Sequence, residues 1–183
     1  SKLIVALERL AQALRVMIWE TAKQEGLSPI QAQVLIHLRY HQNCRLSDLA
    51  KRFDITKATL SDAVKTLEVK ALLKRSTDLE DARASYLQLT SQGKKVVQRI
   101  ERWAERAKEG LIDLDRNTKQ DALLLAMQLI ENLHHSGTIS VAKMCTNCRF
   151  LVQEPSYHCR LLNKPLKLEA LRVDCPEHQP KAA

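Results

Sequence analysis

The stretch RLSDLAKRFDITKATLSDAVKTLEVKALLKR, residues 45–75, decides the fold class of this chain. Apolar residues recur at three- and four-residue steps on both sides of Asp54-Ile55, which predicts a helix over 47–53 and a second helix from Thr56 to about residue 70. Ser47 and Thr56 stand where the N-caps of these helices are expected. Two short helices joined by a tight turn are typical of a helix-turn-helix. The predicted buried stripe of the second helix is Leu60, Ala63, Val64 and Leu67.

The segment after the second helix is predicted to form a β-hairpin. Residues 72–76 and 85–89 have the pattern of half-buried strands, and the charged run TDLEDARA lies between them. A charged hairpin in this position forms the wing of a winged helix. Amphipathic helices flank the region, because apolar residues recur at helical spacing over 3–23, 29–40, 90–110 and 117–133.

The composition favours helices and a polyanionic partner. Aromatic residues make up 4% of the 183 residues and there are four glycines, a poor supply for β-sandwich strands or for the phosphate loops of a Rossmann fold. The 29 Lys and Arg against 21 Asp and Glu give a net charge of +8, which suits nucleic acid or an anionic membrane surface. Residues 45–99 hold 12 basic and 7 acidic residues, a net of +5, which favours DNA.

Membrane proteins and enzymes are not indicated by the sequence. No run approaches the roughly 20 apolar residues that span a bilayer, and no secretory leader pattern opens the chain, so we expect a cytoplasmic protein without a membrane partner. The phosphate-loop, dinucleotide-binding, nucleophile-elbow and zinc-protease motifs are missing from the sequence. We therefore expect no enzymatic activity.

The solvent face of the helix over 56–70 has the side chains that a DNA-reading helix needs. Short hydrogen-bonding groups reach base edges in the major groove, and cations reach phosphates. An arginine in the wing can enter the narrow adjacent minor groove. The predicted DNA-contacting residues are Ser47, Thr56, Lys57, Thr59, Ser61, Asp62, Lys65 and Arg83.

Three runs in order, LSPIQAQVLIHL, the stretch 45–75 and DLEDARASYLQLTSQGK, resemble the MarR family of bacterial winged-helix transcription regulators. The resemblance covers about 135 residues and implies a homodimer whose terminal helices interlock, a helix at 56–70 that reads the major groove of operator DNA, and a wing that includes Asp81 and Arg83. Ala71 occupies the place of a usual glycine, and Ala84 that of a common second arginine or aspartate. The leucine-rich terminal helices expose more apolar surface than one wing domain can cover, which independently favours a dimer.

The tail of the chain carries a cysteine cluster, MCTNCRFLVQEPSYHCRLLNKPLKLEALRVDCPEH, residues 144–178. In a reducing compartment such a cluster indicates a metal site before it indicates disulfides. Two cysteines at C-x2-C can bind one centre, and two distant thiolates can complete its ligand set. The predicted metal ligands are Cys145, Cys148, Cys159 and Cys175.

Two centres fit this pattern, a [4Fe-4S] cluster and Zn²⁺. The step Cys175-Pro176 resembles the Cys-Pro of ferredoxin-type ligation, and the two isolated later cysteines resemble those of small high-potential iron-sulfur modules. Structural zinc sites more often use two C-x2-C pairs. His178 is a replacement ligand, an outer-shell group or an exposed tail histidine. Cys44 is predicted to be a small buried residue, or else a sensing thiol.

The predicted fold class is mainly α: a winged helix-turn-helix with a small β-hairpin wing, long terminal dimerisation helices and a short cysteine-rich metal-binding tail. The predicted domains are 1–137, for DNA binding and dimerisation, and 138–183, for the metal. The function that follows is a homodimeric DNA-binding transcription regulator whose metal centre acts as a redox sensor. The alternatives are a repressor that responds to a small-molecule effector and has a structural zinc tail, and a winged-helix protein-interaction scaffold with a redox module.

Overall fold

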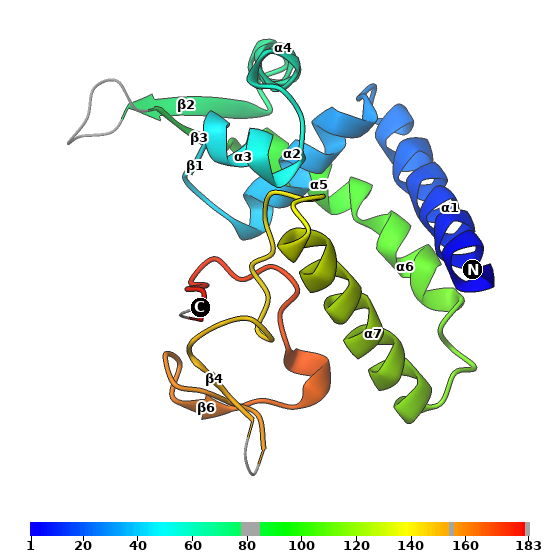
Figure 1. Ribbon diagram of the computed structural model, residues 1–183. Helices are drawn as coiled ribbons and strands as arrows, with labels where there is room; N and C mark the ends of the chain where they lie inside the picture. Colours follow the sequence, from blue (N-terminus) through cyan, green and yellow to red (C-terminus); the bar gives the residue numbers. More distant parts are fainter. Residues whose placement is uncertain (78–84, 154–155, 182–183) are drawn as a thin grey trace. The chain divides into compact units, whose positions relative to one another are not determined.

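The stretch that decides the fold forms two helices and a strand. They are α3 (Leu46–Arg52), α4 (Lys57–Val69) and β2 (Leu73–Thr77), shown in Figure 1. This computed structural model describes residues 1–77, 85–153 and 156–181. The chain falls into two compact units, residues 1–112 and residues 113–183, which are described separately.

The turn between α3 and α4 depends on a left-handed residue. Asp54 has a φ of +50°, a conformation that Asp tolerates because its short polar side chain can bond the nearby backbone. The Ile55 amide then donates to the carbonyl oxygen of Ala50 at 3.1 Å and closes the end of α3. Thr56 begins α4 as predicted, since its hydroxyl accepts a hydrogen bond from the Thr59 amide at 3.1 Å.

The predicted N-cap at Ser47 is wrong. The N-cap lies two residues earlier, at Arg45, without a side-chain cap bond, and helix α3 begins at Leu46. The reason is β1 (Cys44–Arg45), which pairs antiparallel with β3 (Ser85–Leu89) and delivers the chain directly into the helix. The sequence does not reveal β1, because a two-residue strand has no periodicity.

The wing is a three-stranded sheet of order β1-β3-β2. Strands β2 and β3 pair antiparallel from Leu73 opposite Leu89 to Thr77 opposite Ser85, which confirms the predicted hairpin strands to within one residue. The hairpin tip lies outside the described residues.

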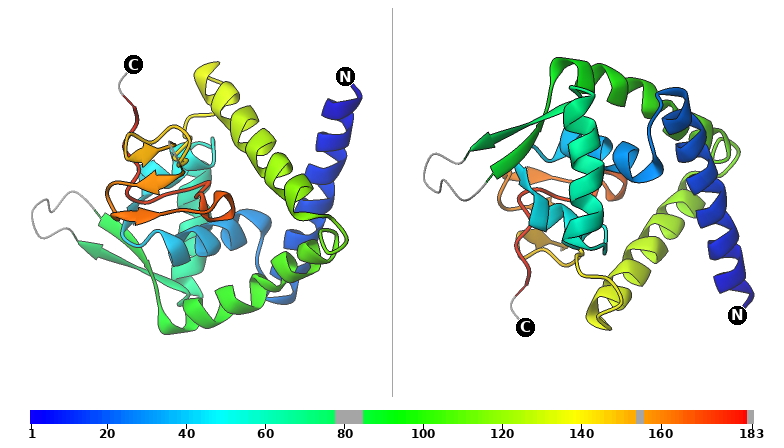
Figure 2. Two further views of the ribbon diagram at one scale, coloured as in Figure 1. Left: turned by 90° about the horizontal axis from the view of Figure 1, so that it is seen from below. Right: turned by 90° about the horizontal axis from the view of Figure 1, so that it is seen from above.

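Four further helices complete the first unit: α1 (Lys2–Gln24), α2 (Pro29–Tyr40), α5 (Ser91–Ile100) and α6 (Arg102–Glu109). The single helix predicted over 90–110 is interrupted at Glu101, and the two pieces follow one another along one curved path (Figure 2). Tyr40 and Arg39 of α2 bind the Glu101 carboxylate there, the hydroxyl at 2.7 Å and the guanidinium Nε at 3.2 Å. The helix is thus interrupted at Glu101, the residue that binds two side chains of α2.

The core of the first unit joins α2, α3, α4, α5 and the wing sheet. Each fully buried leucine or valine contributes about 1.5–3 kcal/mol relative to exposure, so these side chains hold the helix-turn-helix against the rest of the unit. The largest fully buried members are Leu35, Leu38, Leu49, Leu60, Leu67, Leu87, Val97 and Ile100.

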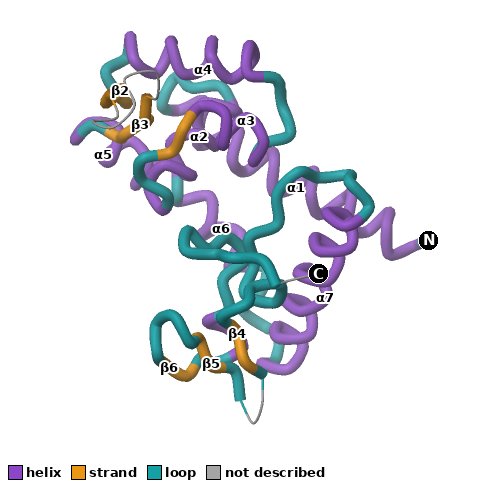
Figure 3. The backbone as a smooth tube through the Cα atoms, turned by 60° about the vertical axis from the view of Figure 1, so that its left-hand side comes forward, coloured by secondary structure: helices purple, strands orange, loops and turns teal. Residues whose placement is uncertain are grey.

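The second unit begins with α7 (Arg116–His135), whose N-cap Asp115 accepts hydrogen bonds from the amides of Asn117 and Thr118. The tail after it is mostly loop (Figure 3). Three two-residue strands, β4 (Leu151–Val152), β5 (His158–Cys159) and β6 (Lys164–Pro165), form an antiparallel sheet in that order. A 3-10 helix, η1 (Leu168–Ala170), follows.

The core of the second unit joins α7 to the tail. Met127 of α7 is fully buried together with Met144, Cys145 and Leu171 of the tail. The compact unit accordingly starts at residue 113, before α7. The predicted division into domains at residues 137 and 138 stays a prediction, since it groups α7 by function with the winged helix.

Candidate functional site

Helix α4 presents a polar face to solvent opposite its buried stripe. The stripe is confirmed: Leu60, Val64 and Leu67 are fully buried and Ala63 nearly so. Figure 1 shows α4 at the edge of the first unit, where its other face is open. The predicted DNA-contacting residues on that open face are Thr56, Lys57, Thr59, Asp62 and Lys65, all exposed, with Ser61 half-buried.

The first turn of α4 combines a helix N-terminus with a cation. The hydroxyls of Thr56 and Thr59 lie 2.9 Å apart, so the two side chains order each other at the start of the helix. The unpaired backbone amides of a helix N-terminus favour anions such as phosphate. Lys57 adds a full positive charge in the same turn, which makes this end of α4 the more electropositive one.

Lys65 lies one turn of α4 beyond Ser61 and near Asp62. Its Nζ is 3.8 Å from the Asp62 carboxylate, and both side chains are more than two-thirds exposed. An exposed pair of this kind contributes little stability, about 0–1 kcal/mol, so a stronger anion can displace the carboxylate. Lys65 can therefore contact a phosphate at small cost.

The structure changes the view of two neighbouring residues. Ser47 was predicted to contact DNA, whereas Arg45 was not. The Ser47 hydroxyl donates to the Asp48 carboxylate at 3.4 Å, within α3 rather than on α4. Arg45 is exposed on β1, donates to the Tyr86 hydroxyl at 3.3 Å and lies 5.4 Å from the centre of that ring. Arg45 thus adds a cation beside the wing. It is missing from the predicted DNA-contacting residues, and only the charge count over residues 45–99 included it.

The wing is joined to α4 by an ion pair. The Nε of Arg75 on β2 donates to the Glu68 carboxylate at 2.9 Å, in a partly exposed position. The predicted wing residues Asp81 and Arg83 lie outside the described residues, in 78–84. Within the described residues, this ion pair links the base of the wing to α4.

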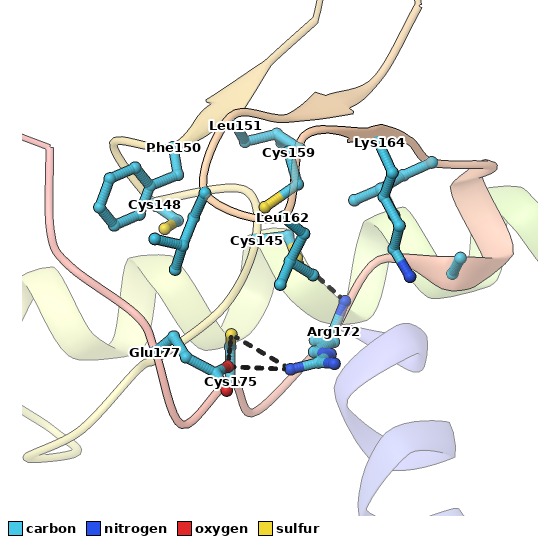
Figure 4. Close-up of a pocket in the computed structure, with 13 residues that line it drawn as sticks. Cys145, Cys148, Phe150, Leu151, Cys159, Leu162, Lys164, Arg172, Cys175 and Glu177 are labelled. Carbon is cyan, nitrogen blue, oxygen red and sulfur yellow. Dashed lines mark hydrogen bonds and ion pairs between the residues drawn. The ribbon is translucent and has the colours of Figure 1, made fainter.

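All four tail cysteines line one cavity of about 260 Å³ in the second unit (Figure 4). Cys145 and Cys148 are buried, and Cys159 and Cys175 are half-buried. None of the four is in a disulfide. The residues that the sequence analysis singled out for a metal thus converge, although they are spread over 31 positions of the chain.

Three backbone hydrogen bonds hold the segments that carry Cys145, Cys148 and Cys175 together. In the turn from Cys145 to Cys148 the amide of the second cysteine donates to the carbonyl oxygen of the first at 3.1 Å. The Cys145 amide also donates to the carbonyl oxygen of Arg172 at 2.9 Å, and the Cys175 amide to that of Lys143 at 2.8 Å. The fourth thiol, Cys159, reaches the cavity from β5, next to β4.

Burial favours the neutral form of two of these thiols. It raises the pKa of Cys145 and of Cys175 above the ordinary value, against hydrogen bonds that favour the thiolates. The Arg172 amide donates to the Cys145 sulfur at 3.2 Å, and the Arg172 guanidinium lies 3.7 Å from the Cys175 sulfur. A metal must therefore displace protons from buried thiols, and once it does, Arg172 faces two negatively charged sulfurs.

His178 supports the C-x2-C turn. Its Nε2 lies 2.8 Å from the Asn147 side-chain oxygen, which also accepts from the Met144 amide at 3.1 Å. The Asn147 amide nitrogen donates to the carbonyl oxygen of Ala142 at 3.0 Å. Burial lowers the pKa of His178, which favours the neutral ring. His178 therefore contacts the turn that holds Cys145 and Cys148, and its role toward a metal stays a prediction.

Cys44 is distant in sequence from the tail cluster and has a local partner. It is half-buried against the core of the first unit, and its thiol donates to the carbonyl oxygen of His41 at 3.1 Å. Cys44 was predicted to be a small buried residue or else a sensing thiol, and the structure leaves it half-buried. Cys44 therefore supplies a natural control for experiments on the other four cysteines.

The elements of the first unit define a winged helix-turn-helix protein: two helices joined by a tight turn, followed by a two-stranded wing on a third short strand. Residues 27–85 match the model of the MarR family. That match covers the helix-turn-helix and the first wing strand, less than half of the chain. Proteins of that family are transcription regulators and not enzymes.

Known proteins share this fold. The HTH-type transcriptional repressor MdtR of Bacillus subtilis is 28% identical over 93 residues, which cover 51% of this chain and 60% of the repressor. A MarR transcriptional regulator from Methanosarcina mazei aligns with a TM-score of 0.64 at 20% identity, covering 72% of this chain and 96% of that one. The S. aureus MepR-DNA complex aligns with a TM-score of 0.62 at 21% identity, covering 70% and 96%.

The match thus spans less than two thirds of the MdtR repressor's length. In the part of the chain that the structure describes, no helix is both long and apolar enough to cross a membrane.

Proposed function

We propose that this chain is a transcription regulator that binds duplex operator DNA by inserting α4 into the major groove. The observation that carries the proposal is the two-sided character of α4: a fully buried apolar stripe fixes the helix, and the opposite face is open and polar. A major groove about 12 Å wide accepts a helix, and its base edges need the kind of short polar groups that Thr59 and Ser61 offer.

Charge supports DNA as the partner. The net charge of +8 suits a polyanion, and Lys57, Lys65 and Arg45 are exposed on or beside the helix-turn-helix. Each phosphate that a cation neutralises releases condensed counterions, so affinity should fall steeply with salt. The proposed role agrees with that of the MdtR repressor and with the DNA complex of MepR, two proteins that are similar to this chain.

The regulator is proposed to act as a homodimer. Helix α1 exposes large apolar side chains along much of its length, and α7 exposes Leu125 and Leu133. A second copy would cover them, since surfaces of this kind are costly to leave in water. Two copies carry two α4 helices, so the operator is expected to be pseudo-palindromic, with half-sites about one helical turn apart. The exposed residues of α1 are Leu3, Ile4, Val5, Leu10, Val16 and Trp19.

The tail is proposed to bind a metal centre, Zn²⁺ or a [4Fe-4S] cluster, through its four cysteines. Four thiolates suffice for either. Cys145 belongs both to the sulfur-lined cavity and to the core that packs on Met127 of α7. Loss of the centre would therefore loosen the support of α7, one of the two proposed dimerisation helices. In this way a metal or redox signal can change DNA affinity, provided that the two states differ in affinity for DNA.

A small-molecule effector is a second candidate signal, favoured by a cavity of about 550 Å³ in the first unit. Lys74 and Lys94 line it together with Gln42, Gln88 and Gln98, so an anionic ligand is the expected class. A thermal-shift screen of aliphatic and aromatic carboxylates tests this. A stabilising compound that fails to stabilise the Lys74→Ala/Lys94→Ala variant supports the effector site, and a screen without any stabilising compound contradicts it.

Selection from a library of random duplexes tests the main proposal. The purified full chain is expected to enrich an inverted repeat with half-sites about one helical turn apart. Enrichment of a repeat would support both DNA reading and the dimer, whereas an enriched single half-site would support DNA reading alone. A library that stays random over repeated rounds would contradict DNA reading and favour the protein-interaction scaffold.

A further inference from the structure

The cavity that the four tail cysteines help to line is larger than one metal ion. Their cavity measures about 260 Å³, whereas one water needs only about 10–15 Å³ of such space. A structural zinc ion lies in a closed tetrahedral shell of four ligands, with Zn–S distances of about 2.3 Å, and leaves no room between the sulfurs. The cavity therefore matches a group of several atoms better than a single ion.

The spacing of the sulfurs points the same way. Four thiolates around one zinc ion lie about 3.8 Å from one another, as follows from tetrahedral geometry at about 2.3 Å. Among the residues that the structure describes, no three of these cysteines bring their sulfurs within 4.8 Å of one another. In a four-iron cluster each iron takes one cysteine sulfur, so the body of the cluster keeps the four sulfurs apart.

Most of the remaining walls of the cavity are apolar, although Lys164, Arg172 and Glu177 also line it. Figure 4 shows Phe150, Leu151 and Leu162 around the sulfurs, and Leu161 and Leu166 line the same cavity. Apolar walls exclude water from a cluster and so help to set its reduction potential. Arg172 offers the opposite kind of contact, since its backbone amide and guanidinium approach the sulfurs of Cys145 and Cys175.

We infer that this cavity binds one [4Fe-4S] cluster, with Cys145, Cys148, Cys159 and Cys175 as its four ligands. The inference rests on the metal-binding part of the proposed function and replaces its two alternatives by one. It also separates the ligands into two groups. Cys145 and Cys148 come from one turn, whereas Cys159 and Cys175 reach the cluster from β5 and from the segment after η1.

Anaerobic purification of the full chain, followed by incubation with iron salts, sulfide and dithiothreitol, tests the inference. We expect about four iron and four acid-labile sulfide per chain, with a broad thiolate-to-iron absorption near 400 nm. When the same protein is offered Zn²⁺ without iron, we expect its affinity for zinc to be lower than its affinity for the cluster. One zinc per chain after anaerobic purification, without sulfide, would overturn the inference, and so would a protein that takes up neither iron nor zinc.

Serine variants assign the ligands. Each of Cys145→Ser, Cys148→Ser, Cys159→Ser and Cys175→Ser is expected to lower iron and sulfide content to half or less of the wild-type value. Cys44→Ser, the matched control, should keep the full content. Circular dichroism of each variant identifies those that fail to fold. The half-buried ligand Cys175 keeps the test valid if the variant of the buried Cys145 fails to fold. Equal content in all five variants would contradict the assignment.

The outcome is independent of whether the chain binds DNA. Iron and sulfide are counted on the free protein, and DNA binding is measured in parallel on the same preparation. A protein that assembles the cluster but enriches no duplex retains this inference and loses the proposed function. A colourless zinc protein that binds an operator would contradict this inference and support the proposed DNA-binding function.

Discussion

The Thr90 hydroxyl donates a hydrogen bond to the carbonyl oxygen of Ala71 at 2.7 Å, across the junction between α4 and α5. Thr90 also caps α5, since its hydroxyl oxygen accepts from the Gly93 amide at 2.9 Å. Ala71 has a φ of +55°, in the left-handed region. The bond thus fixes a strained residue at the point where the reading helix ends and the wing begins.

Replacement of Ala71 by glycine should stabilise the first unit. A residue with a side chain costs about 1 kcal/mol in the left-handed region, and glycine does not have this cost. Part of the gain is offset, because glycine gives the unfolded chain more conformational entropy. We expect Ala71→Gly to raise the free energy of unfolding by about 0.5–1 kcal/mol in a urea titration. The same change at Ala11, an exposed position within α1, should lower it by about the same amount. Equal signs at the two positions would refute the explanation.

Gly93 is expected to tolerate no side chain. A Cβ at this position would lie 1.9 Å from the carbonyl oxygen of Leu72, a backbone atom that cannot rotate away. Gly93→Ala should therefore destabilise the protein by about 1–3 kcal/mol, as overpacking of a close contact does. Gly110→Ala is the control, because its Cβ would lie 3.5 Å from the nearest atom, an ordinary contact. Urea midpoints measured for both variants check this, and a silent Gly93→Ala would show that α5 and Leu72 pack less closely.

The second unit should lose stability in acid through Glu169. Arg116 binds its carboxylate at 2.7 Å and Gln120 donates to it as well, which lowers the pKa of Glu169 from 4.5 to about 2. Because the pKa is lower in the folded chain, the ion pair stabilises it fully above pH 4.5, and this contribution disappears as the pH falls toward 2. A carboxyl NMR titration should find the low pKa, and Arg116→Gln should raise it. A wild-type Glu169 that titrates near 4.5 would contradict the contact.

Arg172 is expected to raise the reduction potential of the inferred cluster. Its amide and guanidinium approach two ligand sulfurs, and such contacts stabilise the reduced cluster, which is the more negative form. Arg172→Gln should keep the full iron content and lower the potential in an anaerobic redox titration. Lys167→Gln, at an exposed lysine of the same tail, serves as the charge-matched control. An unchanged reduction potential in the Arg172 variant would show that the guanidinium does not influence the cluster.

The parts of the fold that the sequence predicts are those with local signals. The stripe that begins at Leu60, the N-cap Thr56 and the hairpin strands each follow from spacing or from one side chain. Strand β1, the interruption at Glu101 and the tail sheet depend on partners far along the chain, and two-residue strands have no period to detect. The predicted N-cap at Ser47 was wrong for this reason, since β1 leads the chain into α3 with the N-cap two residues earlier, at Arg45.

The candidate sites divide in the same way. The four cysteines could be predicted to converge, because thiols of this spacing in so short a tail have few other roles. The size of their cavity and the approach of Arg172 could not, since both arise from backbone pairing between residues 143–145 and 172–175. Arg45 escaped notice because its place beside the wing is set by pairing with Tyr86, 41 residues away.

DNA affinity of charge variants of α4 tests the central claim most directly. Fluorescence anisotropy with the selected duplex compares wild type with Lys57→Ala/Lys65→Ala and with Lys95→Ala, an exposed lysine of α5. The account predicts that the double variant binds at least tenfold more weakly and that its salt slope falls by about 2, whereas Lys95→Ala binds as wild type does. Equal affinity and equal salt slope in all three proteins would contradict the placement of α4 on DNA.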